Sequence, residues 1–224
     1  MATKKTEVIE IQPIEEVKFN IRIVGDTPLI MHKWTSKARR QLLENMQGGR
    51  KGKAKEKKNP VFDFIDCMYW MSEMPDVTNE TDEEECERLF NKAIAEGAKF
   101  CFPVTAFKQA AISAAYRLGW SKDKMSLRGV FFIESDENGM VEIKSDAPIM
   151  REDTVKVGMG GADLRYRGEF RNWYADLTVI YNKNGNYDVN SIVNMINAGG
   201  FVCGVGEWRP ERDGQYGMFH VQTP

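Results

Sequence analysis

The sequence is short of the residues that hold metal ions and disulfide bridges. It has two histidines, His32 and His220, and four scattered cysteines that form no CxxC pair. Zinc sites need closely spaced histidines or cysteines, and secreted disulfide scaffolds need a regular cysteine framework. We therefore expect reduced thiols, no metal site, no cofactor and a cytoplasmic location.

Long apolar runs and familiar catalytic motifs are also missing. No apolar stretch has the length of a membrane span, and the N-terminal MATKKTEVIE lacks the apolar centre of a signal peptide. The sequence contains no HExxH, no GxSxG and no Walker loop. We expect no membrane association and no catalytic residues.

The overall composition is that of an ordinary globular protein. The 224 residues are 42% hydrophobic and 29% charged, which is enough to bury a full core. A net charge of −2, from 31 basic and 33 acidic residues, does not require a nucleic-acid partner. It does not exclude one either, because a local patch binds rather than the average charge. Residues 1–224 are interpreted as a single domain.

Charge of each sign is concentrated in its own segment. Residues 47–60, QGGRKGKAKEKKNP, predict a basic flexible loop, and residues 75–99 an acidic insertion. The loop either contacts a nucleic-acid backbone or only aids solubility, and the acidic insertion either mimics nucleic acid or pairs with the basic loop of a neighbouring subunit. Such pairing predicts a chain or a ring.

Two further segments carry clustered basic residues. The helix predicted over 35–46 has Arg39 and Arg40 and follows Lys33, which indicates either polyanion contact or a solvated face. Residues 150–172 predict an extended arm or hairpin in which arginines alternate with Tyr166 and Phe170. Arginines bind phosphates and rings stack on bases, a combination typical of single-stranded nucleic-acid binding. The alternative is an arm that packs on its own domain or on a neighbouring subunit.

The most unusual stretch is glycine-rich and lies near the end, at residues 199–223. Its six glycines either turn at positive φ or bring backbone close to another group. Arg209 and Arg212 lie in the same stretch, and backbone N–H groups together with arginines match phosphate oxygens. The alternative is a set of tight turns with Trp208 in the core.

The order of predicted elements indicates an α+β fold. A strand at 17–23 is followed by insertions, a helix at 100–119, and two strands at 129–134 and 140–144 joined by an Asn-Gly hairpin turn. A strand at 173–181, a helix at 189–198 and a strand at 218–222 complete the chain. This is the βαββαβ pattern of a ferredoxin-like fold with large insertions.

A glycine-rich loop between the last helix and the last strand resembles the RAMP superfamily, the RNA-binding subunits of class 1 CRISPR effector complexes. The core elements and GGFVCGVGEWRPERDGQYG carry this resemblance. It implies that the core holds the backbone of a single strand, that subunits assemble head to tail, and that residues 150–172 form a thumb-like hairpin reaching the neighbour. Some nucleases of that superfamily use a histidine as general base, so His32 makes a metal-independent ribonuclease the minor alternative.

Four stretches are also similar to a group of bacteriophage and prophage proteins: GDTPLIMHKW, FPVTAFKQAAISAA, DLRYRGEFRNW and GVGEWRPERDGQYGMFHV. This second resemblance covers most of the chain and implies phage origin without a specific activity.

The sequence therefore predicts a non-catalytic, homo-oligomeric phage protein that binds single-stranded DNA or RNA in recombination, annealing or strand protection. The alternative is a protein-interaction module, such as a phage inhibitor of a host defence complex, whose partner is a host or phage protein. The predicted nucleic-acid contacts are Lys33, Arg39, Arg40, Lys53, Lys55, Lys57, Lys58, Arg151, Arg165, Tyr166, Arg167, Arg171, Trp208, Arg209 and Arg212.

Overall fold

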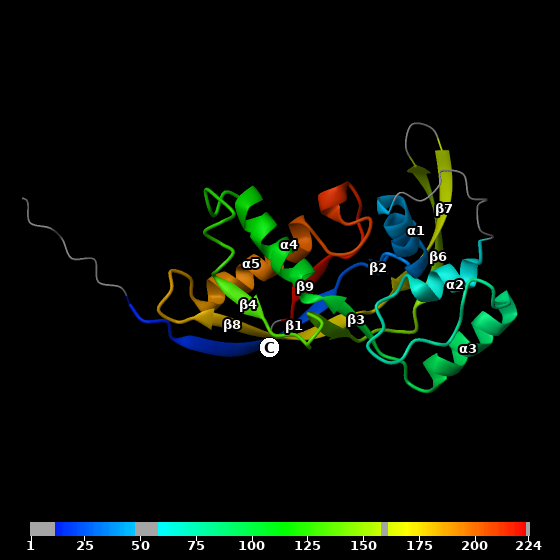
Figure 1. Ribbon diagram of the computed structural model, residues 1–224. Coiled ribbons are helices and arrows are strands. Elements are labelled where there is room, and N and C mark those ends of the chain that lie inside the picture. Colours follow the sequence, from blue (N-terminus) through cyan, green and yellow to red (C-terminus); the bar gives the residue numbers. More distant parts are fainter. Residues whose placement is uncertain (1–11, 48–57, 158–160, 223–224) are drawn as a thin grey trace, which may run out of the picture.

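The computed structural model describes residues 12–47, 58–157 and 161–222 (Figure 1). Helices and antiparallel sheets alternate along the chain, so the predicted α+β class is confirmed. In chain order the first elements are β1 (Glu16–Gly25), β2 (Leu29–Met31), α1 (Ser36–Met46), α2 (Pro60–Asp66), α3 (Glu83–Ala95), β3 (Phe100–Pro103) and α4 (Val104–Arg117). They are followed by β4 (Phe131–Ile133), β5 (Met140–Ile143), β6 (Ile149–Val157), β7 (Gly161–Phe170), β8 (Tyr174–Asn182), α5 (Val189–Val202), the 3₁₀ turn η1 (Pro210–Arg212) and β9 (Phe219–Val221).

The largest sheet has four strands in the order β4-β8-β1-β9, and every neighbouring pair is antiparallel. Side chains of β1 alternate between its two faces, as the sequence pattern predicts. Lys18 and Arg22 lie on the polar face, where they pair with Glu134 and Asp176. Ile23 is fully buried on the opposite face.

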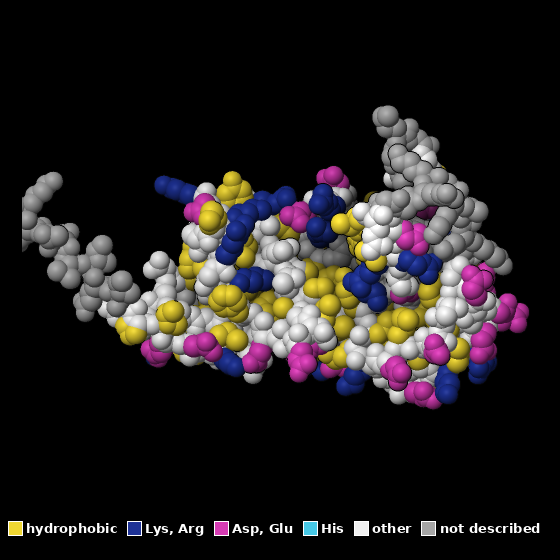
Figure 2. Space-filling view, in the orientation of Figure 1, with side chains coloured by type: hydrophobic (Ala, Val, Ile, Leu, Met, Phe, Trp, Pro, Cys, Tyr) yellow, Lys and Arg dark blue, Asp and Glu magenta, His cyan; other side chains and the backbone are white. Residues whose placement is uncertain are grey.

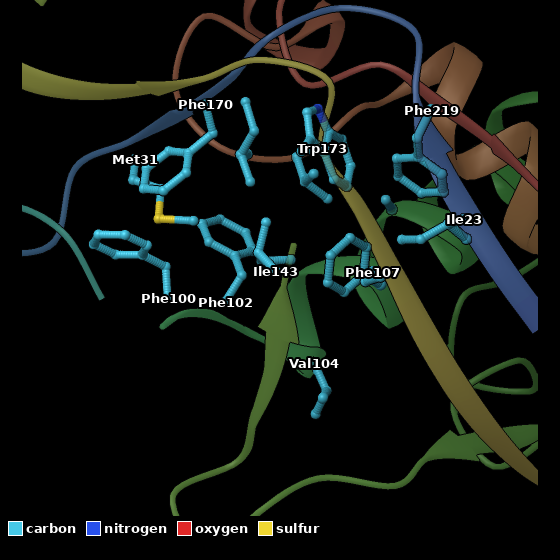
Figure 3. Close-up of a cluster of buried hydrophobic side chains, with 14 of the residues drawn as sticks. Ile23, Met31, Phe100, Phe102, Val104, Phe107, Ile143, Phe170, Trp173 and Phe219 are labelled. Carbon is cyan, nitrogen blue, oxygen red and sulfur yellow. The ribbon is translucent and has the colours of Figure 1, made fainter. Parts of the chain in front are cut away.

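Helices α4 and α5 cover the apolar face of this sheet (Figure 1). They approach closely because small residues line their contact. A Cβ added to Gly199 of α5 would lie 2.7 Å from the backbone nitrogen of Ala111 in α4. Below the helices, Phe107, Trp173 and Phe219 pack ring against ring (Figure 3).

A second sheet, β2-β7-β6, and a strand pair, β3-β5, extend the molecule at one end. Strands β6 and β7 form a long antiparallel pair that rises past α1 and α2 (Figure 1). Its base joins the same core, because Phe170 of β7 packs against Phe100 of β3. Figure 3 shows this aromatic row continuing through Phe102 to Phe107. One hydrophobic core therefore supports both sheets.

Two of the predicted element boundaries are wrong. The segment predicted as one helix from Phe100 begins with strand β3, because Phe100 and Phe102 pair with Ile143 and Val141 of β5. The helix begins only at Val104. At the other end of the chain, α5 continues through Gly199 and Gly200 to Val202, beyond its predicted end at 198.

The predicted hairpin between residues 129–134 and 140–144 is also wrong. A tight turn does form there, with the N–H of Gly139 donating to Asp136 and with φ of +75° at Gly139. The two strands then diverge, because β4 pairs with β8 and β5 pairs with β3. The Asn-Gly signal identified the turn correctly but not the strands on either side of it.

The acidic insertion has a local structural explanation. Asp82 caps α3 by accepting from the N–H of Glu84, and three glutamates occupy the first turn. Negative charge is favourable at a helix N-terminus because the N–H groups there carry partial positive charge. Cys86 and Phe90 face inward, and Phe90 packs on Phe64 of α2.

Candidate nucleic-acid interface

A cavity of about 260 Å³ lies where four distant segments meet. His32 follows the end of β2, Tyr69 and Phe102 form apolar walls, and the segment 204–211 closes the opposite side. The N-terminal turn of α4 contributes Pro103, Thr105, Ala106, Gln109 and Ala110. On the face seen in Figure 2, hydrophobic side chains occupy the middle, and lysine and arginine side chains lie above and beside them.

His32 is neutral at physiological pH. Burial, together with the nearby guanidinium groups of Arg167 and Arg165, lowers the pKa of His32 to about 4. Its Nδ1 atom is buried and has no hydrogen-bond partner within the described part of the chain. The ring is thus an uncharged wall of the cavity rather than a cationic contact.

Lys33, Arg39 and Arg165 do not line the cavity, but Arg39 and Arg165 lie near its wall residues Tyr69 and His32, and Lys33 lies near Cys101, which precedes the wall residue Phe102. Burial raises the pKa of Tyr69 above its ordinary value, whereas the positive charge of Arg39 acts to lower it. Burial also raises the pKa of Cys101 to about 11, while Lys33 acts in the opposite direction. Arg165 is among the groups that lower the pKa of His32. Within residues 12–47, 58–157 and 161–222, no ion pair engages Lys33, Arg39 or Arg165.

Aromatic surface lies beside these cations. Trp34 directly follows Lys33 and is 59% exposed. Trp208 is 37% exposed, so the alternative interpretation that buried it in the core is wrong. Both indoles therefore present surface on which a base can stack.

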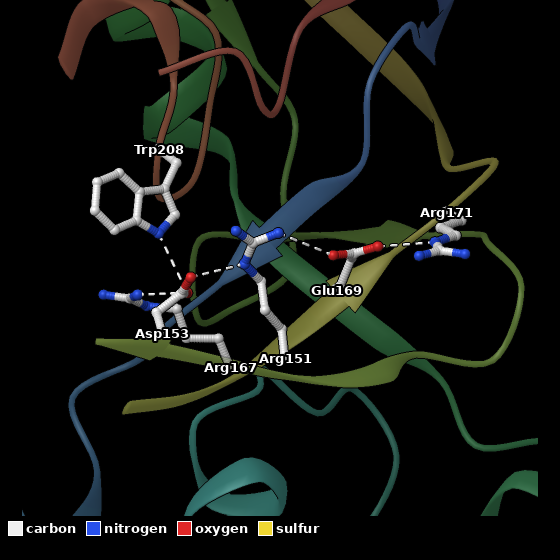
Figure 4. A network of polar contacts seen from close by, with 6 residues as sticks. All are labelled: Arg151, Asp153, Arg167, Glu169, Arg171 and Trp208. Carbon is white, nitrogen blue, oxygen red and sulfur yellow. Dashed lines mark hydrogen bonds and ion pairs between the residues drawn. The ribbon is translucent and has the colours of Figure 1, made fainter. Parts of the chain in front are cut away.

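The base of the β6–β7 arm is held by an ion-pair network (Figure 4). The carboxylate of Asp153 accepts from Arg167 Nη1 at 2.6 Å and from Arg151 Nε at 2.9 Å. Glu169 accepts from Arg151 at 3.2 Å and from Arg171 at 2.8 Å. Arginines and carboxylates thus alternate across the two strands, and their charges largely cancel.

This network removes several predicted contacts from the surface. The side chain of Arg167 is only 3% exposed, and Tyr166 is 8% exposed. Neither can reach a nucleic acid in this conformation, so their proposed roles in phosphate binding and base stacking need correction. Arg151 and Arg171 are held by carboxylates, whereas Arg165 has no ion pair within the described part of the chain. Residue type alone could not separate these arginines, because the pairs Arg151–Glu169 and Arg167–Asp153 depend on the register between β6 and β7.

The glycine-rich segment docks onto this network. Trp208 Nε1 donates to Asp153 Oδ2 at 3.2 Å, and the guanidinium of Arg167 lies 5.6 Å from the Trp208 ring centre. The guanidinium of Arg151 lies 4.6 Å from the ring centre of Tyr216. The arm and the glycine-rich segment are therefore fixed relative to each other.

Contacts within the chain account for the glycines themselves. A Cβ at Gly206 would lie 2.5 Å from the carbonyl oxygen of Ile30, and one at Gly217 would lie 1.7 Å from that of Val205. Both residues have positive φ. The N–H groups of Val205, Glu207 and Gly217 donate to carbonyls of the chain. These contacts favour the tight-turn interpretation over a phosphate cradle.

The remaining predicted residues have varied surroundings. Arg209 lines the cavity and is bonded to Glu211 and to the carbonyl of Gly206. Arg212 is exposed, Arg40 has a partner, and Lys58 pairs with Asp163. Lys53, Lys55 and Lys57 lie outside the described residues.

Several cavity residues were not predicted, among them Tyr69, Thr105, Gln109 and Glu207. They come from segments far apart in the sequence and belong to no local motif. Among these segments, the sequence indicated only where α4 begins, because Pro103 precedes a strongly helical stretch.

No protein-family model matches this chain, and no curated protein matches its sequence. Across the described residues, no three histidine, cysteine, aspartate or glutamate side chains gather as metal ligands would. Nor does any helix among them have the length and apolarity needed to cross a membrane.

Proposed function

We propose that the protein binds single-stranded nucleic acid without catalysis, on the face that holds the cavity and the three cations that have no ion pair among the described residues. The observation that carries this proposal is that Lys33, Arg39 and Arg165 lie near the cavity, with exposed Trp34 next to Lys33 in the chain. Cations without carboxylate partners keep their full charge for phosphates, and the indole offers a sequence-tolerant stacking surface.

We further propose that the four-strand sheet with α4 and α5 is a ferredoxin-like core of the RAMP type. Support comes from the chain order β1-α4-β4-β8-α5-β9 and from the strand order β4-β8-β1-β9. On this proposal, β2, α1, α2, α3 and the β6–β7 arm belong to the insertions. Phage origin and head-to-tail assembly remain proposals that rest on the sequence resemblance.

The second candidate function is a protein-interaction module, and a different surface favours it. A groove of about 650 Å³ runs between the end of α4 and helix α5. Leu118, Trp120 and Phe201 line it and are all exposed. Clustered large apolar side chains at a surface are typical of protein contacts.

Binding of the purified protein to a fluorescent single-stranded oligonucleotide, titrated at several salt concentrations, tests the first proposal. We expect binding that weakens steeply with salt, because each phosphate contact releases counterions. The triple variant Lys33→Ala/Arg39→Ala/Arg165→Ala should bind more weakly. It should also lower the slope of log affinity against log salt by about two, at roughly 0.7 per contact on a single strand.

The matched control is Lys18→Ala/Arg22→Ala/Lys144→Ala, which removes the same charge from side chains paired with carboxylates on the other face of the sheet. This control should leave both the affinity and the slope close to those of the unaltered protein. Equal losses in the two triple variants would indicate attraction to overall charge and would contradict the proposed site. Absence of binding at low salt would transfer support to the protein-interaction module.

A further inference from the structure

The cavity near the three cations has the volume and lining of a site for a planar polar ring. Its walls include the rings of Tyr69, Phe102 and Pro103, while Thr105 and Gln109 are exposed at its mouth. A volume of about 260 Å³ corresponds to roughly nine water molecules at about 30 Å³ each. One nucleobase fits in such a space, with its faces on apolar walls and its edge toward polar groups.

One residue that lines the cavity, Glu207, has the wrong charge for a surface that binds phosphates. Glu207 carries a carboxylate that is 43% exposed, and a negative charge there repels a polyanion. The other carboxylate that lines the cavity, that of Glu211, forms ion pairs with Arg209 and Arg117. Among the described residues, the one ion pair of Glu207 is a long one to Arg167 Nη2, at 3.7 Å, whereas Arg167 Nη1 lies much closer to Asp153, at 2.6 Å.

Glu207 is also held in position by the backbone. Its N–H donates to the carbonyl of Ile30 at 2.9 Å. The preceding residue, Gly206, lies against the same carbonyl. With its backbone anchored in this way, Glu207 presents a carboxylate at the wall of a base-sized cavity, where it can accept hydrogen bonds from a ligand.

We propose that the cavity binds a guanine base of the bound strand and that Glu207 selects it. Among the common bases, only guanine presents two adjacent N–H donors on its Watson–Crick edge, and these match the two oxygens of one carboxylate. Thymine and uracil offer one ring N–H, while adenine and cytosine offer one amino group. Gln109 and Thr105 supply donors for the guanine carbonyl. This inference rests on the proposed nucleic-acid binding and names the base that the same site prefers.

Three oligonucleotides of equal length test the selection. The first is oligothymidine, the second carries one central guanine, and the third carries hypoxanthine there, which lacks the amino group of guanine. We expect the guanine oligonucleotide to bind about ten-fold more tightly than oligothymidine, as a good bidentate contact allows, and the hypoxanthine oligonucleotide to fall between them. If the protein binds RNA more tightly than DNA, the same three oligonucleotides are made on an oligouridine background.

The variant Glu207→Gln should lose the preference and still bind oligothymidine, because only the paired acceptors are removed. The matched control Glu134→Gln lies on the far face of the sheet and should keep the preference. Equal affinity for all three oligonucleotides, or a preference that survives in Glu207→Gln, overturns the guanine inference and leaves the proposed function intact. Failure of the unaltered protein to bind any of them overturns both.

Discussion

Arg167 Nη1 lies 2.6 Å from Asp153 Oδ2, and both side chains are almost fully buried between the β6–β7 arm and the glycine-rich segment. The two residues lie on neighbouring strands, where Arg167 faces Arg151 and Asp153 faces Arg165. Burial opposes ionisation of Asp153, yet hydrogen bonds from Arg167, Arg151 and Trp208 hold its pKa below the ordinary value. The pair therefore connects the arm to the loop that lines the cavity.

Breaking this pair should destabilise the protein. We expect Asp153→Asn to lower the free energy of unfolding by about 3 kcal/mol, because it leaves the Arg167 guanidinium buried without its counter-charge. Chemical denaturation followed by circular dichroism measures the loss. Asp176→Asn is the control, since Asp176 pairs with Arg22 on the exposed face of the sheet, and its effect should be much smaller. A similar loss in both variants would contradict the structural role of the Asp153 pair.

Stability should decrease in mild acid because of His32. Its pKa is about 4 in the folded chain and about 6.5 when unfolded, so the unfolded chain binds more protons between these values. The contribution of His32 to stability is complete above pH 6.5 and is lost as the pH falls toward 4. The shift corresponds to about 3 kcal/mol in full, which we reduce to about 2 kcal/mol because part of the ring meets solvent.

Thermal unfolding from pH 7 to pH 4 tests this prediction in His32→Phe. The variant also removes the unpaired Nδ1, so at pH 7 it should be as stable as the original protein or more stable. Its stability should fall less steeply with acid. The only other histidine, His220, bonds to Asp26 at the surface and does not line the cavity, so His220→Gln is the comparison variant. Identical pH profiles in His32→Phe and the unaltered protein would show that His32 is not the group responsible.

Gly200 is required because any side chain there would clash with a neighbouring strand, and not because its φ angle is positive. It lies within α5, where alanine normally favours the helix by about 1 kcal/mol over glycine. A Cβ there would lie 1.8 Å from the carbonyl oxygen of Phe219 in β9. We expect Gly200→Ala to destabilise the protein by about 3 kcal/mol, since overpacking against backbone cannot relax easily. Gly129→Ala is the control because nothing lies within 4 Å of its added Cβ, and a denaturant series should show little change there.

Local sequence signals predicted the regular elements well. Alternation along residues 17–23 identified β1, and Asn59-Pro60 marked the start of α2, where Asn59 accepts from the N–H of Phe62. These signals succeed because strand alternation and helix capping depend on near neighbours. Signals that depend on distant partners were less reliable. Phe100 and Phe102 were predicted as helical, but pairing with β5 made them a strand.

The site was less predictable than the fold for the same reason. The arginines at 151, 165, 167 and 171 look alike in sequence, yet their pairing differs. Strand register pairs Arg151 with Glu169 and Arg167 with Asp153, Arg171 pairs with nearby Glu169, and Arg165 has no ion pair among the described residues. The cavity combines His32, Gln109 and Glu207, which no local spacing connects. The glycines, by contrast, were recognised as unusual, and their contacts with neighbouring backbone explain why.

Arg165 and Arg171 offer a comparison between a free and a paired arginine in the same arm. Arg171 Nε lies 2.8 Å from Glu169 Oε1, whereas Arg165 has no ion pair among the described residues. If the face binds a strand, Arg165→Ala should weaken binding and lower the salt slope by about 0.7. Arg171→Ala should change both less, because its charge is largely cancelled by Glu169. Parallel salt titrations of the two variants measure the difference, and a larger loss in Arg171→Ala would place the strand on the opposite side of the arm.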